Sequence, residues 1–459
     1  MGSLQGRRRR NIRILVGSIV TVLLVAGLLV VAVDKVAGDD RGELTVAPEP
    51  APVTAAPAVV PVAPDAPIPS TAGISAAIGP ALANPDLGKF SGTIADAVTG
   101  QVLWSAEPAT PMVPASTTKI LTVAAALSTL PADGRVTTEV VQGSRPGEVV
   151  LVGGGDPTIT AKPRGENGYY PGAAHLADLV DQIRASGTPV DRIVVDTSLY
   201  AGPTMAQGWL PTDVPAGFIT PTEPLMIDGG RSDPLVDESP RSTTPALDAG
   251  RALAAALGID QNAVDSGAAA PGAAQVAAVQ SAPLRDRLRQ MMEHSDNVLA
   301  EAIGREVAMK TGAEPSFSGA AASVSQTLFS AGFDLTGLEL HDTSGLSVDD
   351  RITAKSLDEI LTAAAGDGHP KLRPMLDYLP VAGGTGSLAD RYVTGNRVGA
   401  GWVRAKTGTL SGASALAGYV LDESGRVLTF TFMSNDRPPN LSRPALDALA
   451  SSLRTCGCT

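Results

Sequence analysis

A serine and a lysine three residues apart, Ser116 and Lys119 in "PASTTK", are the first side chains whose spacing could do chemistry. On a predicted helix they share one face, and Ser116 would lie in the first turn, where free N–H groups and the helix dipole favour a developing anion. A lysine whose pKa is lowered by burial or by a second cation can take the serine's proton. The pair therefore suggests an activated nucleophile, although a surface lysine near a helix start gives the same pattern.

A second short motif, "HSDN", places Ser295 and Asn297 two residues apart. In a short non-helical turn both side chains can point into one cleft, with Asp296 directed away. The Ser295 hydroxyl could then pass a proton between Lys119 and a leaving group, and the Asn297 amide could bind a backbone group of a substrate. The same three residues also suit a helix N-cap, so the motif alone leaves both interpretations open.

The tripeptide Lys-Thr-Gly occurs twice, and the first copy has a structural explanation. Lys310 ends the helical run "LAEAIGREVAMK", where a cation suits the negative end of the helix dipole. Gly312 then stands where a C-cap glycine belongs. No chemistry is needed to explain this copy.

The second copy follows a strand-like stretch, at Lys406. A strand edge presents backbone N–H groups outward, and Gly408 would leave room for a substrate to lie against the strand. Lys406 would supply a cation, and Thr407 and Thr409 would supply hydroxyls to bind a carboxylate. This copy is therefore the functional candidate.

Ser-x-x-Lys, Ser-Asp-Asn and Lys-Thr-Gly, in this order, form the signature of penicillin-binding proteins and class A β-lactamases. Ser295 follows Ser116 by 179 residues, far more than compact β-lactamases have there. Over roughly residues 86–452 the chain resembles the D-alanyl-D-alanine carboxypeptidase/endopeptidase (DacB-like) family of low-molecular-mass, class C penicillin-binding proteins. Four more segments carry this resemblance: "GGGDPTIT" (153–160), "DRIVVDTSLY" (191–200), "HDTSGLSVDDRITAKSL" (341–357) and "LPVAGGTGSL" (379–388).

The resemblance implies an α/β (α+β) fold: a serine β-lactamase/transpeptidase-like domain in which helices flank an antiparallel sheet. That domain would comprise residues 86–134 and 284–455. An inserted α/β region at 135–283 would separate the first two motifs. The insert looks shorter than in the best-known family members, which implies that one extra subdomain is reduced or absent. Within it, "GDPT" around Asp156 is interpreted as a turn.

The resemblance also implies a role for each motif residue. Ser116 would be the acylated nucleophile, Lys119 its base, and Ser295 a second catalytic hydroxyl. The residues implied to bind substrate are Asn297, Lys406, Thr407, Gly408 and Thr409. The backbone N–H groups of Ser116 and Thr409 would form the oxyanion hole. Lys406 would help to keep Lys119 neutral and attract the C-terminal carboxylate of a D-Ala-D-Ala stem peptide. The mechanism requires no metal and no organic cofactor.

The activity that the resemblance implies is a serine D-Ala-D-Ala carboxypeptidase of peptidoglycan stem peptides, with D,D-endopeptidase activity left open and with β-lactam antibiotics as inhibitors. A serine β-lactamase is one alternative; the long insert and the lack of an obvious deacylating glutamate weigh against it. A non-catalytic envelope protein that binds peptidoglycan is another; the full set of motif residues weighs against it. How long a penicillin label persists would separate the three.

The N-terminal segment predicts a membrane anchor. A basic tail, residues 1–13, precedes "ILVGSIVTVLLVAGLLVVAV", residues 14–33, which contain no charge and are long enough to cross ~30 Å of hydrocarbon as a helix. The basic tail should stay cytoplasmic, so the rest of the chain is expected outside the plasma membrane of a bacterial envelope. A cleaved signal peptide is the alternative. Residues 34–85, rich in Pro and Ala, are predicted to be a linker without a core.

Period and turn signals predict the main elements. Residues 90–108 read as a hairpin around "VTG". In the insert, "TTEVVQG", "GEVVLVGGGDPTIT" and "DRIVVDTSLY" read as strands, and "HLADLVDQIRAS" and "PALDAGRALAAALG" as helices. Helices are expected on either side of "SDN", and the last elements should be a strand, a turn, a strand and a closing helix.

Composition excludes several function classes. The net charge is −12 and no basic face is visible beyond the extreme N-terminus, so nucleic acid is not an expected partner. Two cysteines, Cys456 and Cys458, are too few for a disulfide framework or a closed zinc site, and we expect them in a solvent-exposed tail. The four histidines show no metal-ligand spacing, and His294 is interpreted as a structural residue.

Overall fold

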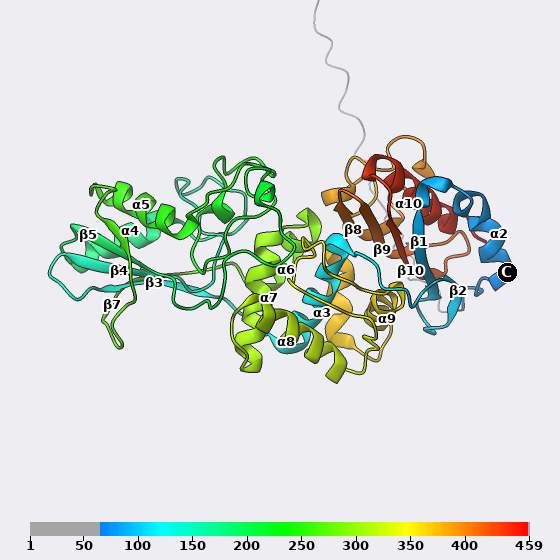
Figure 1. The fold of residues 1–459 in the computed structure, drawn as a ribbon, viewed down its shortest axis with the longest axis horizontal. Helices are drawn as coiled ribbons and strands as arrows, with labels where there is room; N and C mark the ends of the chain where they lie inside the picture. Colours follow the sequence, from blue (N-terminus) through cyan, green and yellow to red (C-terminus); the bar gives the residue numbers. More distant parts are fainter. Residues whose placement is uncertain (1–64, 458–459) are drawn as a thin grey trace, which may run out of the picture. The chain divides into compact units, whose positions relative to one another are not determined.

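The computed structural model describes residues 65–457 (Figure 1). Within them the strands form two five-stranded sheets, in the orders β2-β1-β10-β9-β8 and β6-β5-β4-β3-β7. The strands are β1 (Lys89–Asp96), β2 (Val102–Ala106), β3 (Thr137–Gln142), β4 (Glu148–Val152), β5 (Arg192–Asp196), β6 (Val264–Ser266), β7 (Gln275–Gln280), β8 (Val403–Leu410), β9 (Ala413–Leu421) and β10 (Val427–Asn435).

Helices make up most of the remaining regular structure. The α-helices are α2 (Thr71–Leu82), α3 (Lys119–Thr129), α4 (Leu176–Ser186), α5 (Pro245–Leu257), α6 (Leu284–His294), α7 (Asn297–Thr311), α8 (Phe317–Ser330), α9 (Ala354–Ala365) and α10 (Pro439–Arg454). The short 3₁₀ helices are η1 (Pro85–Leu87), η2 (Ala115–Thr118), η3 (Pro211–Asp213), η4 (Asp228–Gly230), η5 (Pro370–Tyr378), η6 (Gly386–Leu388) and η7 (Arg397–Gly399). The predicted β1–β2 hairpin, the two insert helices and the helices that flank "SDN" are confirmed.

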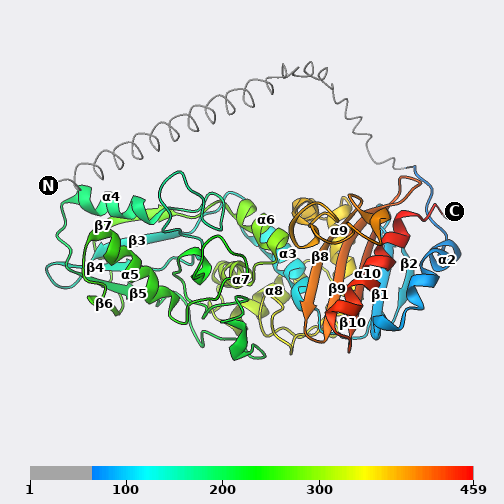
Figure 2. The ribbon, with the colours of Figure 1, turned by 90° about the horizontal axis from the view of Figure 1, so that it is seen from above.

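The first sheet is antiparallel throughout and is covered on both faces. Side chains alternate across it, as the period of a strand requires. On β9, Leu416 and Val420 join a core with α2 and α10. Ala415 and Ala417 face the other way and join the core of α3, α6, α7, α8 and α9. Figure 2 shows α10 lying across this sheet. A helix–sheet–helix sandwich thus holds β8, which carries Lys406, between two cores.

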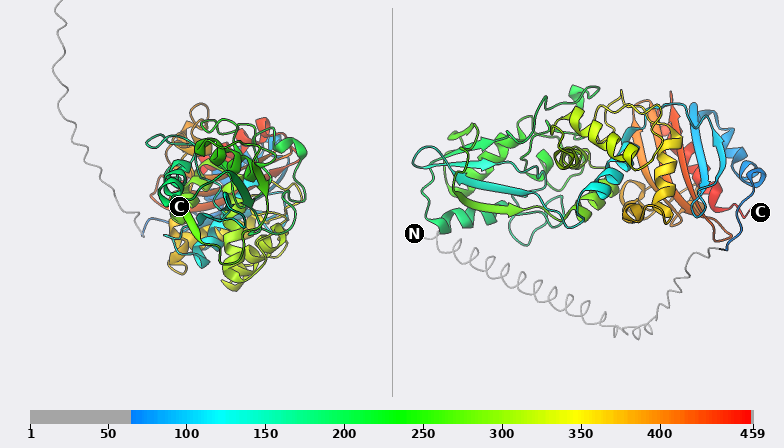
Figure 3. Two further views of the ribbon diagram at one scale, coloured as in Figure 1. Left: turned by 90° about the vertical axis from the view of Figure 1, so that its left-hand side faces the viewer. Right: turned by 90° about the horizontal axis from the view of Figure 1, so that it is seen from below.

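The second sheet lies wholly within the segment between α3 and α6. Its pairs β4–β5 and β5–β6 are parallel, whereas β3 pairs antiparallel with both β4 and β7. The apolar faces of α4 and α5 pack on it and form a core of their own, and Figure 3 shows these elements beside one another. The chain leaves and re-enters close together, because Leu284 N donates to Gly134 O at 2.8 Å.

One boundary expected from the sequence is wrong. The Pro/Ala-rich linker was expected to reach residue 85, but residues 71–82 form helix α2. Ser70 caps it by accepting from Gly73 N at 3.1 Å, and Ile74 and Ile78, one turn apart, are fully buried against the first sheet. The Pro and Ala content hid this helix, since its apolar stripe consists of only two large side chains.

One of the two C-terminal cysteines also departs from expectation; the other, Cys458, lies outside the described residues. Cys456 is not part of an exposed tail: it is 1% exposed and lies in the core formed by α2, α10 and the first sheet. It is also disulfide-bonded. The error arose because composition cannot show that α10 packs over the sheet and carries Cys456 into the core.

The expected membrane segment cannot be located in this structure. Residues 1–13, the predicted span 14–33 and most of the linker lie outside the described residues. Of the helices between residues 65 and 457, none has both the length and the apolar character that crossing a bilayer requires.

Candidate active site

Ser116 lies in a tight turn that precedes a helix. The sequence predicted Ser116 in the first turn of the helix that carries Lys119; in the structure residues 115–118 form the 3₁₀ turn η2, and α3 begins at Lys119. The hydroxyls of Thr117 and Thr118 donate to the carbonyls three residues earlier, at 2.7 and 3.1 Å, and these bonds fit the tighter 3₁₀ spacing. Ala115 has a φ of +48°, a conformation that non-glycine residues rarely adopt, so the surroundings must hold this turn in place.

Two glycines allow other segments to pack directly on this turn. A Cβ at Gly408 on β8 would lie 2.5 Å from Pro114 O. A Cβ at Gly345, whose φ is +78°, would collide with Ala115 O. The space at Gly408 was expected to admit a substrate, but the turn that carries Ser116 fills it. The glycine of Lys-Thr-Gly therefore fixes Ser116 against β8.

Lys119 is fully buried, and its amine has three partners. Nζ lies 3.0 Å from Ser116 Oγ and donates to Asn297 Oδ1 at 2.6 Å and to Ser344 O at 2.7 Å. Burial lowers the pKa of Lys119 to about 8, against the opposing effect of the carboxylates of Asp342, Asp296 and Glu301. Lys119 thus sits beside the serine with a pKa suited to a base near neutral pH.

The partner carbonyl of Ser344 belongs to a loop, residues 341–347, that motif reasoning did not assign to the site. The buried carboxylate of Asp342 organises it by accepting four N–H groups. The donors are Ser344 N at 3.0 Å, Gly345 N at 2.6 Å, Ser347 N at 2.7 Å and, from the insert, Trp209 Nε1 at 2.7 Å. The available signal was the run "HDTSGLS", in which an Asp precedes small residues that suit an Asp-stabilised turn.

The Ser-Asp-Asn motif forms a turn and a helix cap at once. Ser295 ends α6 in the left-handed region, with φ 60° and ψ 32°. Asp296 is the N-cap of α7 and accepts from Leu299 N at 2.8 Å. Asn297 accepts from Lys119 and donates through Nδ2 to Phe218 O at 3.0 Å. Both interpretations that the sequence left open are therefore correct. Ser295 and Asn297 contact the two lysines, and Asp296 caps α7.

Lys406 joins the third motif to the second. Its buried Nζ donates to Ser295 Oγ and to Thr407 O, both at 2.8 Å. Burial, and then the charge of Lys119, lower the pKa of Lys406 well below its ordinary value. The sequence interpretation had Lys406 depress the pKa of Lys119; in the structure burial is the main cause for both amines.

The threonines of the third motif face the cavity. Thr407 shares a 2.7 Å hydrogen bond with Ser387, and Thr409 is exposed. The other Lys-Thr-Gly copy behaves as predicted: Lys310 is exposed in the last turn of α7, and Gly312 caps that helix with φ 79°.

A cavity of about 1210 Å³ opens above the serine. Its lining includes Ser116, Ser295, Asn297, Thr407 and Thr409, with the two lysines beneath it. The segment between α3 and α6 adds a wall that the motifs did not reveal, formed by Leu210, Asp213, Gly217, Phe218, Arg231, Asp237, Glu238 and Arg241. His294 is exposed at the rim, with its ring 5.9 Å from that of Tyr169. Among residues 65–457, no three His, Cys, Asp or Glu side chains gather to hold a metal ion.

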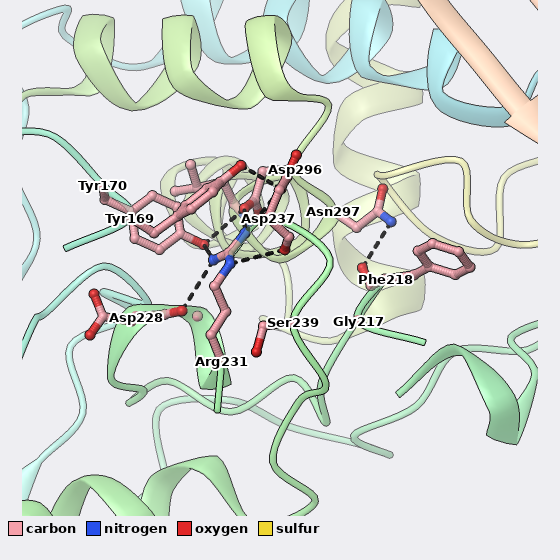
Figure 4. A network of polar contacts seen from close by, with 12 residues as sticks. Tyr169, Tyr170, Gly217, Phe218, Asp228, Arg231, Asp237, Ser239, Asp296 and Asn297 are labelled. Carbon is pink, nitrogen blue, oxygen red and sulfur yellow. Dashed lines mark hydrogen bonds and ion pairs between the residues drawn. The ribbon is translucent and has the colours of Figure 1, made fainter. Parts of the chain in front are cut away.

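Figure 4 shows how this wall meets the Ser-Asp-Asn turn. Arg231 and Tyr170 converge on the carboxylate of Asp296, and Phe218 receives the amide of Asn297. The cavity is therefore bounded by both parts of the chain, and its second motif is fastened to the insert.

Sequence comparisons match nearly the whole chain. The model of the D-Ala-D-Ala carboxypeptidase 3 (S13) family matches residues 74–240 and 235–455. The chain is 52% identical to carboxypeptidase DacB of Mycolicibacterium smegmatis over 98% of its length and 99% of that protein. It is 50% identical to carboxypeptidase Rv3627c of Mycobacterium tuberculosis over 99% of each chain.

Solved structures share the fold. Penicillin-binding protein 4 (dacB) from Haemophilus influenzae has a TM-score of 0.66 at 22% identity, covering 84% of this chain and 98% of that one. The same protein complexed with a novel β-lactam has a TM-score of 0.59 at 20% identity, covering 83% and 98%. At these identities the likeness establishes a common architecture.

Proposed function

Because the chain belongs to the D-Ala-D-Ala carboxypeptidase 3 (S13) family, we propose that it removes the terminal D-alanine of peptidoglycan stem peptides through an acyl-enzyme on Ser116. The observation that carries this assignment is the 3.0 Å contact between Lys119 Nζ and Ser116 Oγ in a buried site. A buried amine with a lowered pKa beside a hydroxyl can act as the base that a serine nucleophile needs.

Acylation begins with neutral Lys119. Two acceptors, Asn297 Oδ1 and Ser344 O, take hydrogens of its amine, so the lone pair can face Ser116. As Ser116 Oγ bonds to the carbonyl carbon of the penultimate D-alanine, its proton passes to Lys119 Nζ. The negative charge that develops on the carbonyl oxygen would be stabilised by the N–H groups of Ser116 and Thr409, worth about 3–4 kcal/mol each.

Ser295 supplies the proton for the leaving group. The C–N bond breaks, and the amine of the departing D-alanine takes a proton from the Ser295 hydroxyl. Ser295 is reprotonated by way of Lys406, which it contacts, with the proton that Lys119 took from Ser116, so Lys119 is neutral again. Thr407 and Thr409 offer hydroxyls to the substrate's terminal carboxylate. Water then attacks the ester and gives its proton to Lys119, which passes it to Ser116 Oγ as the ester bond breaks. The shortened peptide then leaves.

A fluorescent penicillin tests the acyl-enzyme directly. The full chain should form a labelled band that persists for many minutes and is absent in Ser116→Ala. Rapid loss of the label with turnover of the drug would identify a β-lactamase. No label on a folded wild-type chain would exclude the mechanism.

Digestion of purified muropeptides, followed by mass spectrometry, tests the reaction itself. Loss of one D-alanine from a pentapeptide stem is the expected product. Conversion of a cross-linked dimer to monomers would add D,D-endopeptidase activity, since the same acylation can start from a D-Ala–diaminoacid amide.

The substrate determines where the enzyme would act. Peptidoglycan lies outside the cytoplasmic membrane, and residues 14–33 have the length and apolar character of a signal-anchor behind a basic tail. An anchored chain is expected in the membrane fraction, and deletion of residues 1–33 should release it. Recovery of a shortened mature chain in the soluble fraction would show a cleaved signal peptide instead.

A further inference from the structure

The carboxylate of Asp296 is a junction between the catalytic turn and the insert. Oδ1 accepts from Leu299 N at 2.8 Å and caps α7. Oδ2 accepts from Tyr170 Oη at 2.9 Å and from Arg231 Nη2 at 3.2 Å (Figure 4). Both oxygens are thus occupied, one by the helix that begins at Asn297 and the other by the insert.

Arg231 is itself held on every side. Its guanidinium carbon lies 3.4 Å from the ring centroid of Tyr169, within range of a cation–π interaction. Nη1 donates to Tyr170 Oη at 2.9 Å and to Asp228 O at 3.1 Å, and Nε donates to Asp237 O at 3.2 Å. Its side chain is 1% exposed. This arginine is therefore a rigid part of the insert, aimed at Asp296.

The Ser295–Asn297 turn contains a strained residue. Ser295 has a φ of +60°, which a serine adopts only where its surroundings fix it. Neighbours on its C-terminal side are fastened to the insert, Asp296 through Arg231 and Asn297 through the 3.0 Å bond to Phe218 O. Ser295 and Asn297 in turn contact Lys406 and Lys119.

We propose that Arg231 is a positioning residue: by binding Asp296 it holds the Ser295–Asn297 turn so that Ser295 meets Lys406 and Asn297 meets Lys119. The insert is then part of the catalytic unit rather than an appendage. This inference rests on the proposed function, because the positions it explains are those of the acylation machinery.

The ion pair also has an electrostatic consequence for Lys119. The charged groups that face Lys119 are Asp342 in the 341–347 loop, Asp296 in the turn, Glu301 on α7 and Lys406 on β8. Each carboxylate favours the protonated amine. Asp296 already acts in this direction while Arg231 and Arg241 oppose its charge; without Arg231 less of that charge is opposed, so the pKa of Lys119 should rise further. The acidic limb of the acylation rate against pH should then move to higher pH.

Arg231→Met removes the charge and retains much of the stem that packs on Tyr169. Its matched control is Arg287→Met, which also breaks a buried arginine–carboxylate pair, with Glu306. The Arg287 side chain is equally buried, at 1% exposed, but it contacts Ala282 O, Gly134 O and Glu306 and none of the motif residues. Both variants lose a buried ion pair and should lower the thermal midpoint, but only Arg231→Met disturbs the catalytic turn.

The measurement is the second-order rate of acylation of the full chain by fluorescent penicillin between pH 5.5 and 9. Arg231→Met should acylate about 10- to 100-fold more slowly than Arg287→Met, with its acidic limb at higher pH. Arg231→Lys restores the charge and should return the limb toward the wild-type position. The proposal is overturned if Arg231→Met matches Arg287→Met in rate and limb.

A further variant, Tyr170→Phe, keeps the test decisive. If Arg231→Met does not fold, Tyr170→Phe and Arg231→Lys take its place, and wild-type acylation rates in both overturn the proposal. Tyr170→Phe removes only the hydroxyl that bridges Arg231 and Asp296, so a smaller loss of rate in the same direction supports it. If the wild-type chain is labelled on Ser116 and Arg231→Met is labelled at the same rate, this inference fails and the proposed function stands. Wild-type chain that does not label defeats the proposed function and the inference with it.

Discussion

Lys406 Nζ donates a hydrogen bond to Ser295 Oγ at 2.8 Å, and this contact joins β8 to the turn between α6 and α7. The lysine is fully buried, so it cannot act as an exposed charge that collects anions from solvent. Its position beneath the cavity instead couples the third motif to the hydroxyl that would protonate the leaving group. Each buried lysine therefore acts on the site through one serine, Lys119 through Ser116 and Lys406 through Ser295.

The two Lys-Thr-Gly copies make a controlled comparison. Lys406→Ala should lower the acylation rate by at least ~100-fold, because Ser295 loses its partner and the proton path is broken. Lys310→Ala should stay within about twofold of wild type, since Lys310 is exposed at the end of α7. Penicillin acylation rates of the two folded variants check this, and equal rates would remove Lys406 from the mechanism.

The acylation rate should depend on pH through Lys119. In the proposed mechanism the active form is the neutral amine, and the pKa of Lys119 is lowered to about 8. Below that pH, each unit reduces the neutral fraction about tenfold, so the rate should rise with pH and level off above about 8. Stopped-flow acylation across pH 5.5–9 measures the limb. A rate that is already level at pH 6 would point to a carboxylate base instead.

Gly408 should be intolerant of a methyl group. In Gly408→Ala the new Cβ would meet Pro114 O at 2.5 Å, so the turn that carries Ser116 must shift. A shift of this kind at the nucleophile can cost about 100-fold in rate. Gly79→Ala is the control, because nothing lies within 4 Å of a Cβ there and its φ is not positive. Acylation at the wild-type rate in Gly408→Ala would show that the turn is not held by this contact.

Short motifs and periodicity predicted much of this molecule. The spacing of Ser116 and Lys119 anticipated a contact that the structure places at 3.0 Å. The glycine at 312 was predicted as a helix cap because a cap is set by local chain geometry. These features depend on residues close in sequence, or on motifs whose chemistry requires them to meet.

Features that depend on tertiary packing were missed. Nothing local in "VRAKTG" says that Gly408 packs on Pro114, which is remote in sequence. Arg231 lies far from any motif, and its role follows only once Asp296 is seen to face it. Helix α2 was assigned to a linker because its stripe is Ile74 and Ile78 among small residues, and its stability comes from the sheet beneath it.

Helix α2 should therefore contribute to stability as a core element does. Ile74 is fully buried against the first sheet, so Ile74→Ala should lower the free energy of unfolding by about 2–5 kcal/mol. Ile68 precedes the helix and is 40% exposed, so Ile68→Ala should change it by less than about 0.5 kcal/mol. Equilibrium denaturation of the full-length variants separates these values. Equal midpoints would mean that residues 71–82 do not pack on the sheet in solution, and that the catalytic domain begins at residue 86, as the sequence alone had suggested.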